Sequence, residues 1–325
     1  MENSAKVPVL MIVFNRPDTT KVVLDRIREY KPTHLYITAD GPRNGNENDL
    51  KKTAEVRALF ENLDWPCEVI TNYKTVNQGC KMAVSSGITW FFDQVESGII
   101  LEDDCLVDYS FFVMCEELLA KYAADEEVMS IGASNFQYPS TQTPEATYYF
   151  SRYNHIWGWA SWKRAWKNYK LTPQQLPKEQ LLDSIKQLFQ SKAERTYWLA
   201  IYDYVMSGKL DTWDFQWQFS MWAKGGIAIT PQVNMVTNLG FGPDATHGND
   251  PNSWMAKLIA LPIKFPIVHP SDKSLNNEAD RVTSDRLFNI YKSYRTNHFK
   301  IKLATWLPSN AKKELKKLML KFKPA

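Results

Sequence analysis

The sequence predicts an α/β protein with a mostly parallel central sheet flanked by helices. Four short stretches rich in Val, Ile and Leu recur within about the first hundred residues, and turn residues and a helical pattern separate each from the next. This alternation is typical of parallel sheets, because the helices that connect the strands cover both faces. Hydrophobic residues make up 44% of the 325 residues, enough to form the core of one large or two moderate domains.

The predicted elements follow one another in a regular order. Asp18 is expected to cap the first helix, which carries Val22, Val23, Ile27 and Tyr30 on one side. The expected strands span residues 7–14, 34–39, 67–71, 98–101, 128–132 and 226–230. The other expected helices span residues 47–63, 79–95, 110–124, 177–190, 193–207, 211–224 and 271–294.

Three carboxylates directly follow the fourth predicted strand. Glu102, Asp103 and Asp104 come after the apolar residues 99–101. Burying a charge is costly unless it is paired or binds a metal, so three acids at the end of a core strand favour a site for a hard divalent cation. The alternative is a helix N-terminus capped by Asp108 or Ser110, which does not account for three acids in a row.

Polar residues also follow the other predicted strands. Asn15 and Arg16 end the first strand, Asp40 ends the second, and Thr71 and Asn72 end the third. Ligands of parallel sheets bind beyond the carboxyl ends of the strands. We therefore expect these residues to share one rim with the acidic triplet.

Aromatic residues gather after the predicted sheet of the first half. Residues 148–166 contain four Trp and three Tyr around Gly158, which fits either core packing or a platform for sugar rings. Residues 211–224 fit an ordinary amphipathic helix, but Asp214 lies between Trp213 and Phe215. Apolar surroundings raise the pKa of a carboxyl, and such a group can act as a general base. The Gly-rich residues 238–249 include His247, which is either structural or a ligand.

The charge is unevenly distributed along the chain. From Arg295 to the end there are nine Lys or Arg and one acid, whereas the preceding residues are mildly acidic. Leu315, Leu318, Met319 and Phe322 share one face of the tail, so the tail suits an anionic membrane surface. The alternative is a solvated helix docked on its own domain.

The cysteines and the hydropathy pattern indicate a cytoplasmic protein, with peripheral contact to the inner face of the cell membrane through the tail. The four Cys show no CxxC pair and no zinc spacing, which favours a reducing compartment. The N-terminal residues lack a signal-peptide pattern, and no stretch has the ~18 consecutive apolar residues of a membrane span. We expect no nucleic-acid partner.

Seven motifs between about residues 7 and 250 resemble those of the GT-A glycosyltransferases, which use nucleotide-diphospho-sugars. The likeness is to the bacterial family-2-like enzymes and to the N-acetylglucosaminyltransferase I type. The motifs are VFNRP (13–17), ADGPR (39–43), VNQGC (76–80), IILEDDC (99–105), WGWASWKRAW (157–166), WDFQW (213–217) and GFGPDATHG (240–248).

The resemblance implies a Rossmann-like GT-A catalytic domain over residues 1–250. Residues 1–132 would form its nucleotide-sugar-binding half and residues 133–250 its acceptor-binding half, followed by a helical extension with the basic tail at residues 251–325. The expected donor-binding residues are Asn15, Arg16, Asp40, Lys81, Glu102 and Asp103. Asp104 and His247 would bind Mn²⁺ or Mg²⁺, and Trp157, Trp159 and Trp213 would bind the acceptor.

The implied reaction transfers a sugar, expected to come from a UDP-sugar, to a hydroxyl of a glycan or lipid-linked saccharide. A cation stabilises the charge on the departing nucleoside diphosphate. An inverting enzyme also needs a carboxylate that accepts the proton of the attacking hydroxyl; Asp214 is the first candidate, with Asp211 and Asp244 in reserve. The triplet is Glu-Asp-Asp where many relatives have Asp-x-Asp, which leaves the identity of the metal ligand open. The QxxRW motif of processive relatives is missing, which favours transfer of one sugar per encounter.

Two other classes remain as alternatives. A sugar-1-phosphate nucleotidyltransferase would have a Gly-rich GxGxRxxP stretch after the first strand, where this chain has FNRP. A non-catalytic carbohydrate-binding protein would use the Trp residues but would have no use for the acidic triplet.

Overall fold

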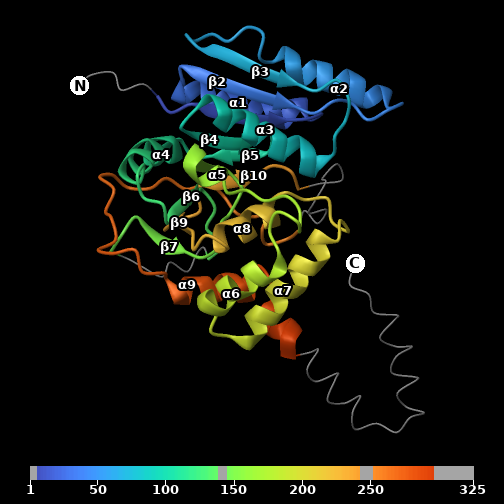
Figure 1. Ribbon diagram of the computed structural model, residues 1–325. Coiled ribbons are helices and arrows are strands. Elements are labelled where there is room, and N and C mark those ends of the chain that lie inside the picture. Colours follow the sequence, from blue (N-terminus) through green and yellow to red (C-terminus); the bar gives the residue numbers. More distant parts are fainter. Residues whose placement is uncertain (1–5, 138–144, 242–251, 296–325) are drawn as a thin grey trace.

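The computed structural model describes residues 6–137, 145–241 and 252–295. Within these ranges, eight strands form a central sheet in the order β3-β2-β1-β4-β8-β6-β9-β7, and β10 and β5 form a separate antiparallel pair (Figure 1). All strands of the central sheet except β8 and β7 run in the same direction. The predicted α/β class with a mostly parallel sheet flanked by helices is confirmed.

The strands of the first half are β1 (Val9–Val13), β2 (His34–Ala39), β3 (Glu68–Tyr73), β4 (Ser97–Glu102) and β5 (Cys105–Val107). Those of the second half are β6 (Val128–Gly132), β7 (Tyr148–Ser151), β8 (Trp159–Trp162), β9 (Ile227–Pro231) and β10 (Val236–Asn238). The helices are α1 (Pro17–Tyr30), α2 (Glu47–Ala58), α3 (Cys80–Gln94), α4 (Tyr109–Lys121), α5 (Lys163–Trp166), α6 (Lys178–Leu188), α7 (Lys192–Met206), α8 (Asp214–Trp222) and α9 (Asn277–Arg286).

Helices cover both faces of the sheet, and the side chains of β1 therefore alternate between two cores. Val9, Met11 and Val13 pack with residues of α1 and α4, whereas Leu10 and Ile12 pack with residues of α3. All five residues of β1 are buried, as expected for a parallel strand that has both faces covered.

The carboxyl ends of β1, β2 and β4 meet at one edge of the sheet. Val13 pairs with Ala39, and Ile12 pairs with Glu102. After Glu102 the chain turns at residues 103–104 into β5, which pairs with β10. The acidic triplet therefore lies where the chain leaves the central sheet.

Helix α1 begins directly at this edge. Pro17 lies in its first turn, where the fixed φ of proline suits a helix start, and Arg16 is the N-cap residue without a side-chain cap bond. The predicted N-cap, Asp18, lies in the first turn instead. Because the side chain of Arg16 does not cap the helix, it is available to the acids at the end of β4.

Two regions differ from the sequence-based expectation. Residues 148–166, expected to be rich in loops, contain β7, β8 and α5, and the three-residue strands β5 and β10 were not predicted. Helix α9 covers only part of residues 271–294. It begins after the cap residue Asn276, and Asn289 has a φ of 52°, a left-handed conformation that interrupts a helix.

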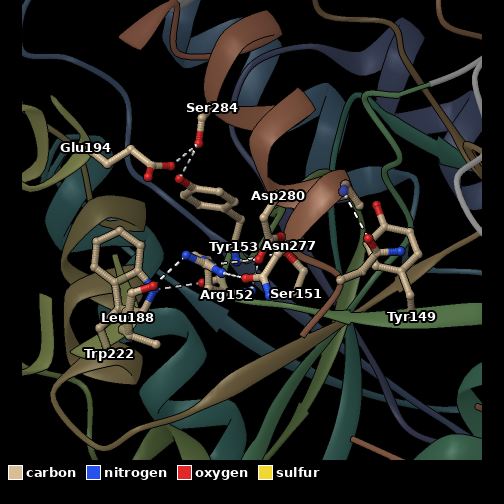
Figure 2. Close-up of polar contacts among 12 residues, drawn as sticks. Tyr149, Ser151, Arg152, Tyr153, Leu188, Glu194, Trp222, Asn277, Asp280 and Ser284 are labelled. Carbon is tan, nitrogen blue, oxygen red and sulfur yellow. Dashed lines mark hydrogen bonds and ion pairs between the residues drawn. The ribbon is translucent and has the colours of Figure 1, made fainter. Parts of the chain in front are cut away.

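A buried ion pair connects β7 with α9 and α6 (Figure 2). Arg152 Nε donates to Asp280 Oδ2 at 2.8 Å, and Ser151 Oγ donates to Asp280 Oδ1 at 2.5 Å. Arg152 Nη1 also donates to the carbonyl oxygen of Leu188. Arg152 and Asp280 are both buried, so these bonds satisfy charges that water cannot reach.

Asp280→Ala is expected to lower the free energy of unfolding by about 3–5 kcal/mol, because it leaves the buried guanidinium of Arg152 without its counter-charge. Urea denaturation followed by circular dichroism measures this loss. Asp203→Ala, which removes the exposed ion pair with Lys178, is the control and should cost less than about 1 kcal/mol. Equal losses in the two variants would contradict the structural role of the buried pair.

Candidate functional site

A cavity of about 620 Å³ lies at the edge of the sheet where β1, β2 and β4 end. Of the predicted site residues, the cavity is lined by Asn15, Arg16, Asp40, Glu102, Asp103, Asp104, Trp157, Trp213 and Asp214, and also by Asp211, a reserve candidate for the base. Lys81 and Trp159 are not among its lining residues, and His247 and Asp244 lie outside the described residues.

Arg16 neutralises part of the acidic triplet. Its Nη2 lies 2.5 Å from Asp103 Oδ1, and its Nη1 lies 2.8 Å from Asp104 Oδ2. Asp103 also accepts a hydrogen bond from the backbone N–H of Phe14 at 3.3 Å. The loop that follows β1 therefore supplies both the cation and the amide that hold the acids at the end of β4.

Glu102 is the least well compensated member of the triplet. In the part of the chain that the structure describes, its buried Oε1 has no hydrogen-bond partner. Burial raises the pKa of Glu102, the charges of Asp104 and Asp103 raise it further, and Arg16 opposes them. Burial likewise raises the pKa of Asp103, against the effect of Arg16. The site thus holds more carboxylates than one guanidinium can balance.

The carboxylates of the acidic triplet at the end of β4 suit a hard cation that takes further ligands from an anionic substrate. Among the described residues, no group of three or more His, Cys, Asp or Glu is arranged to hold a metal ion without such help. Carboxylate oxygens are nevertheless the ligands that Mg²⁺ and Mn²⁺ prefer, and Asp104 and Glu102 both line the cavity. A cation at Asp104 would have to share this carboxylate with Arg16.

Asp40 organises the loop opposite the triplet. Its Oδ1 accepts from the backbone N–H groups of Gly41 and Gln78 at 2.8 and 2.9 Å, and its Oδ2 accepts from Asn77 Nδ2 at 2.9 Å. Burial raises the pKa of Asp40, and the backbone hydrogen bonds oppose this shift. The carboxylate joins the end of β2 to the segment that leads into α3.

Asp214 approaches the cavity from the other half of the chain. It is the first residue of α8, it is half-buried, and its Oδ1 accepts a hydrogen bond from Thr212 Oγ1. Asp211, a few residues earlier, accepts at 3.3 Å from the backbone N–H of Lys81 near the start of α3. Only the backbone of Lys81 takes part in this contact.

The predicted acceptor-binding tryptophans have three different environments. Trp157 is half-buried, lines the cavity and contacts Phe241, with ring centroids 5.8 Å apart. Trp213 lines the cavity but is only 2% exposed, and it stacks on Trp159 at 5.8 Å. Trp159 is 1% exposed and lies in the core with Trp166. The structure thus brings Trp157 and Trp213 to the cavity, and Trp159 supports Trp213 from behind.

Several cavity residues were not predicted. They include Arg43, Lys74, Asn77, Cys80, Asn238 and Gly240. The ADGPR and VNQGC motifs contain Arg43, Asn77 and Cys80. Their position beside turn residues could therefore have indicated that they line the cavity. Burial raises the pKa of Cys80 to about 12, which keeps its thiol protonated and excludes it as a thiolate nucleophile at neutral pH.

Gly240 allows the chain to pass close to the triplet. The backbone N–H of Leu239 donates to the carbonyl oxygen of Asp104 at 2.8 Å. A Cβ at position 240 would lie 2.2 Å from Asp104 Oδ2 and 3.0 Å from Arg16 Nη1. Any larger residue at this position would therefore displace the ion pair.

No protein-family model matches the chain, and no curated protein matches its sequence. Solved structures that overlap with it include 4-diphosphocytidyl-2C-methyl-D-erythritol synthase from Anaerococcus prevotii, with 10% identity, a TM-score of 0.30 and coverage of 61% of this chain and 83% of the other. UDP-glucose pyrophosphorylase complexed with UDP-glucose has 11% identity, a TM-score of 0.34 and coverage of 70% and 90%. Mouse xyloside xylosyltransferase 1 has 12% identity, a TM-score of 0.32 and coverage of 66% and 81%. Backbone overlap this low supports no functional conclusion, so function has to be inferred from the residues of the cavity.

Gly240→Ala is expected to lower the free energy of unfolding by about 1–3 kcal/mol, because the added methyl group overlaps Asp104. Chemical denaturation measures the change. The same substitution in an Asp104→Ala background should cost much less, because the atom that it would clash with is then absent. An equal cost in both backgrounds would show that the strain arises elsewhere.

Proposed function

We propose that this protein is a GT-A-type glycosyltransferase that moves a sugar from a nucleotide-diphospho-sugar to a hydroxyl of a glycan or glycolipid. The observation that carries the proposal is that one cavity is lined by the acidic triplet, Arg16, Asp40 and Asp214. These groups come from both halves of the chain, so different segments can hold the two substrates. The donor is expected to be a UDP-sugar.

The donor occupies the side of the cavity formed by the ends of β1, β2 and β4. Asn15, Arg16 and Asp40 contact the nucleotide, and the triplet faces its diphosphate. Arg16 reaches two acids at once, so an incoming diphosphate offers its guanidinium an alternative partner. Asp103, held by the N–H of Phe14, keeps the triplet in position during this exchange.

A divalent cation, Mn²⁺ or Mg²⁺, is proposed to bind Asp104, with His247 as a further ligand. When bound, it would stabilise the negative charge on the departing nucleoside diphosphate. The excess of carboxylates and the unpaired Oε1 of Glu102 support a cation in this corner. Glu102 and Asp103 are proposed to contact the ribose or to order the site beside the cation.

Asp214 is proposed to accept the proton of the attacking acceptor hydroxyl. It lines the cavity from α8, whereas the triplet lines it from the end of β4. Thr212 donates to one of its oxygens, which fixes the direction of the carboxylate. A base that is separate from the diphosphate-binding groups fits an inverting displacement, with Trp157 and Trp213 beside the acceptor.

The cellular location remains a prediction. Within the described ranges, no helix is long and apolar enough to cross a membrane. The basic tail lies outside the described residues. A cytoplasmic location with contact to an anionic membrane surface through this tail is proposed from its sequence pattern.

Asp104→Ala is expected to abolish metal-dependent donor binding. A nucleotide-sugar present with Mn²⁺ at a hundredfold excess over its Kd should stabilise the wild-type protein by about 2.7 kcal/mol, and most of this should disappear in the variant. A thermal-shift screen of UDP-, GDP-, CDP- and ADP-sugars with and without Mn²⁺ measures the effect. Binding of free sugars without nucleotide or metal would favour a carbohydrate-binding protein. Formation of a nucleotide-sugar from a nucleoside triphosphate and a sugar 1-phosphate would favour a nucleotidyltransferase.

Asp214→Asn is expected to lower kcat by about 10²–10⁴-fold, because the amide cannot accept the proton of the acceptor hydroxyl. Donor affinity should stay near the wild-type value, since Asn keeps the size of the side chain and Asp214 lines the cavity from α8, not from the end of β4. Steady-state kinetics and donor titration of the same preparation measure both quantities. A variant that retains turnover would remove Asp214 from this role.

A further inference from the structure

Helix α2 carries a buried carboxylate behind the cavity wall. Asp49 is 0% exposed and does not itself line the cavity. Its place is fixed by the helix start, because the N-cap residue Asn46 accepts a hydrogen bond from the backbone N–H of Asp49 at 3.0 Å. The proposed function involves no role for this carboxylate.

Asp49 binds two side chains that do line the cavity. Its Oδ2 accepts from Arg43 Nε at 2.5 Å, and its Oδ1 accepts from Arg43 Nη2 and from Asn15 Nδ2, each at 2.8 Å. Arg43 follows β2 and Asn15 follows β1, so one carboxylate connects two loops of the wall. The hydrogen bonds from Arg43 hold the pKa of Asp49 down at about 2, so the ion pair is fully charged at neutral pH.

The contacts determine what each side chain offers to a ligand. Asn15 directs its amide nitrogen to Asp49, which leaves its carbonyl oxygen as an acceptor. Arg43 uses Nε and one N–H of Nη2, which leaves three N–H donors. Its guanidinium also lies 5.8 Å from the centre of the Phe14 ring.

Asp49 holds the Arg43 guanidinium near the Phe14 ring, and the remaining N–H donors of Arg43 suit a flat group that has acceptors at its edge. Phe14, Asn15 and Arg43 together offer an aromatic face, an acceptor and several donors on one part of the wall. A nucleoside has a flat ring with donors and acceptors at its edge, so it matches this set. The charged diphosphate is instead expected beside Arg16 and the acidic triplet at the end of β4.

We infer that Asp49 is a positioning residue that orients Asn15 and Arg43 toward the nucleoside end of the donor. This inference rests on the proposed function, because it assigns a task within the same donor site. Asp49 acts through these two side chains and through the backbone N–H of Arg43, which donates to its Oδ2 at 3.3 Å. Its removal therefore weakens nucleotide binding without touching the groups that face the acceptor.

The test is a calorimetric titration of the full-length chain with UDP, GDP, CDP and ADP in the presence of Mn²⁺. Asp49→Ala is expected to weaken binding of the preferred nucleotide about tenfold, the effect of losing about one well-oriented hydrogen bond to a ligand. In an Asn15→Ala/Arg43→Ala background, the same substitution should change the affinity by less than about twofold, because it has no side chain left to orient. In kinetic assays the donor KM should rise while kcat stays near its wild-type value.

Asp280→Asn serves as the control, because it disturbs a buried Arg–Asp pair that is remote from the cavity lining. It should lower the unfolding midpoint without changing nucleotide affinity. The inference is overturned if Asp49→Ala binds the nucleotide as the wild type does, if its effect is equally large in the Asn15→Ala/Arg43→Ala background, or if Asp280→Asn weakens binding as much. A wild-type chain that binds none of the four nucleotides would refute the proposed function and this inference with it. Normal wild-type binding with no effect of Asp49→Ala would refute this inference alone.

Discussion

The charge balance at the end of β4 is the constraint on which the rest of the cavity depends. A core strand that ends in three acids can fold only if their charges are compensated or remain in contact with polar groups. Arg16 supplies this compensation to Asp103 and Asp104, and it can do so because Pro17 starts α1 directly after it. The same short segment thus ends β1, starts α1 and supplies the cation. Gly240 completes the arrangement by leaving space for the ion pair.

Two of the Arg–Asp arrangements among the described residues have opposite character. Arg152 and Asp280 are both below a tenth exposed, and all their partners are structural, so this pair holds α9 on the sheet (Figure 2). The side chain of Arg16 is 25% exposed and faces a cavity. Similar chemistry therefore connects two elements in one place and lines a cavity in the other, and the difference lies in access to solvent.

The rim could be predicted from sequence, because the carboxyl ends of parallel strands meet at one edge. Asn15, Asp40 and Glu102 follow from strand ends alone, and the structure brings all three to one cavity. Thr71 and Asn72 were expected on the same rim, but β3 continues to Tyr73 and neither residue lines the cavity. The contribution of Asp214 from the other half depended on resemblance, since spacing along the chain says nothing about contact across it. His247 remains a prediction because it lies outside the described residues.

Other features depend on the folded chain and could not be predicted. Trp157 and Trp159 are two residues apart in one aromatic run, yet one lines the cavity and the other is buried, which composition cannot distinguish. The reason for a glycine at position 240 can be recognised only from the folded structure, in which a Cβ at this position would overlap Asp104. Asp49 has the sequence pattern of an ordinary helix start, and its contact with Asn15 joins residues 34 positions apart.

The pairing of β4 with β8 has a mechanical consequence. Four consecutive residue pairs, from Ser97 with Trp162 to Ile100 with Trp159, join the strand that carries the triplet to the strands of the second half. Strands of one continuous sheet therefore support both walls of the cavity. A hinge motion between the walls would have to break the hydrogen bonds between β4 and β8. The spacing of the two walls is set by the twist and spacing of the strands. For the proposed transferase, the donor and acceptor sides would therefore keep a fixed separation, and sequence changes in the loops above the sheet could alter the acceptor side without altering the donor side.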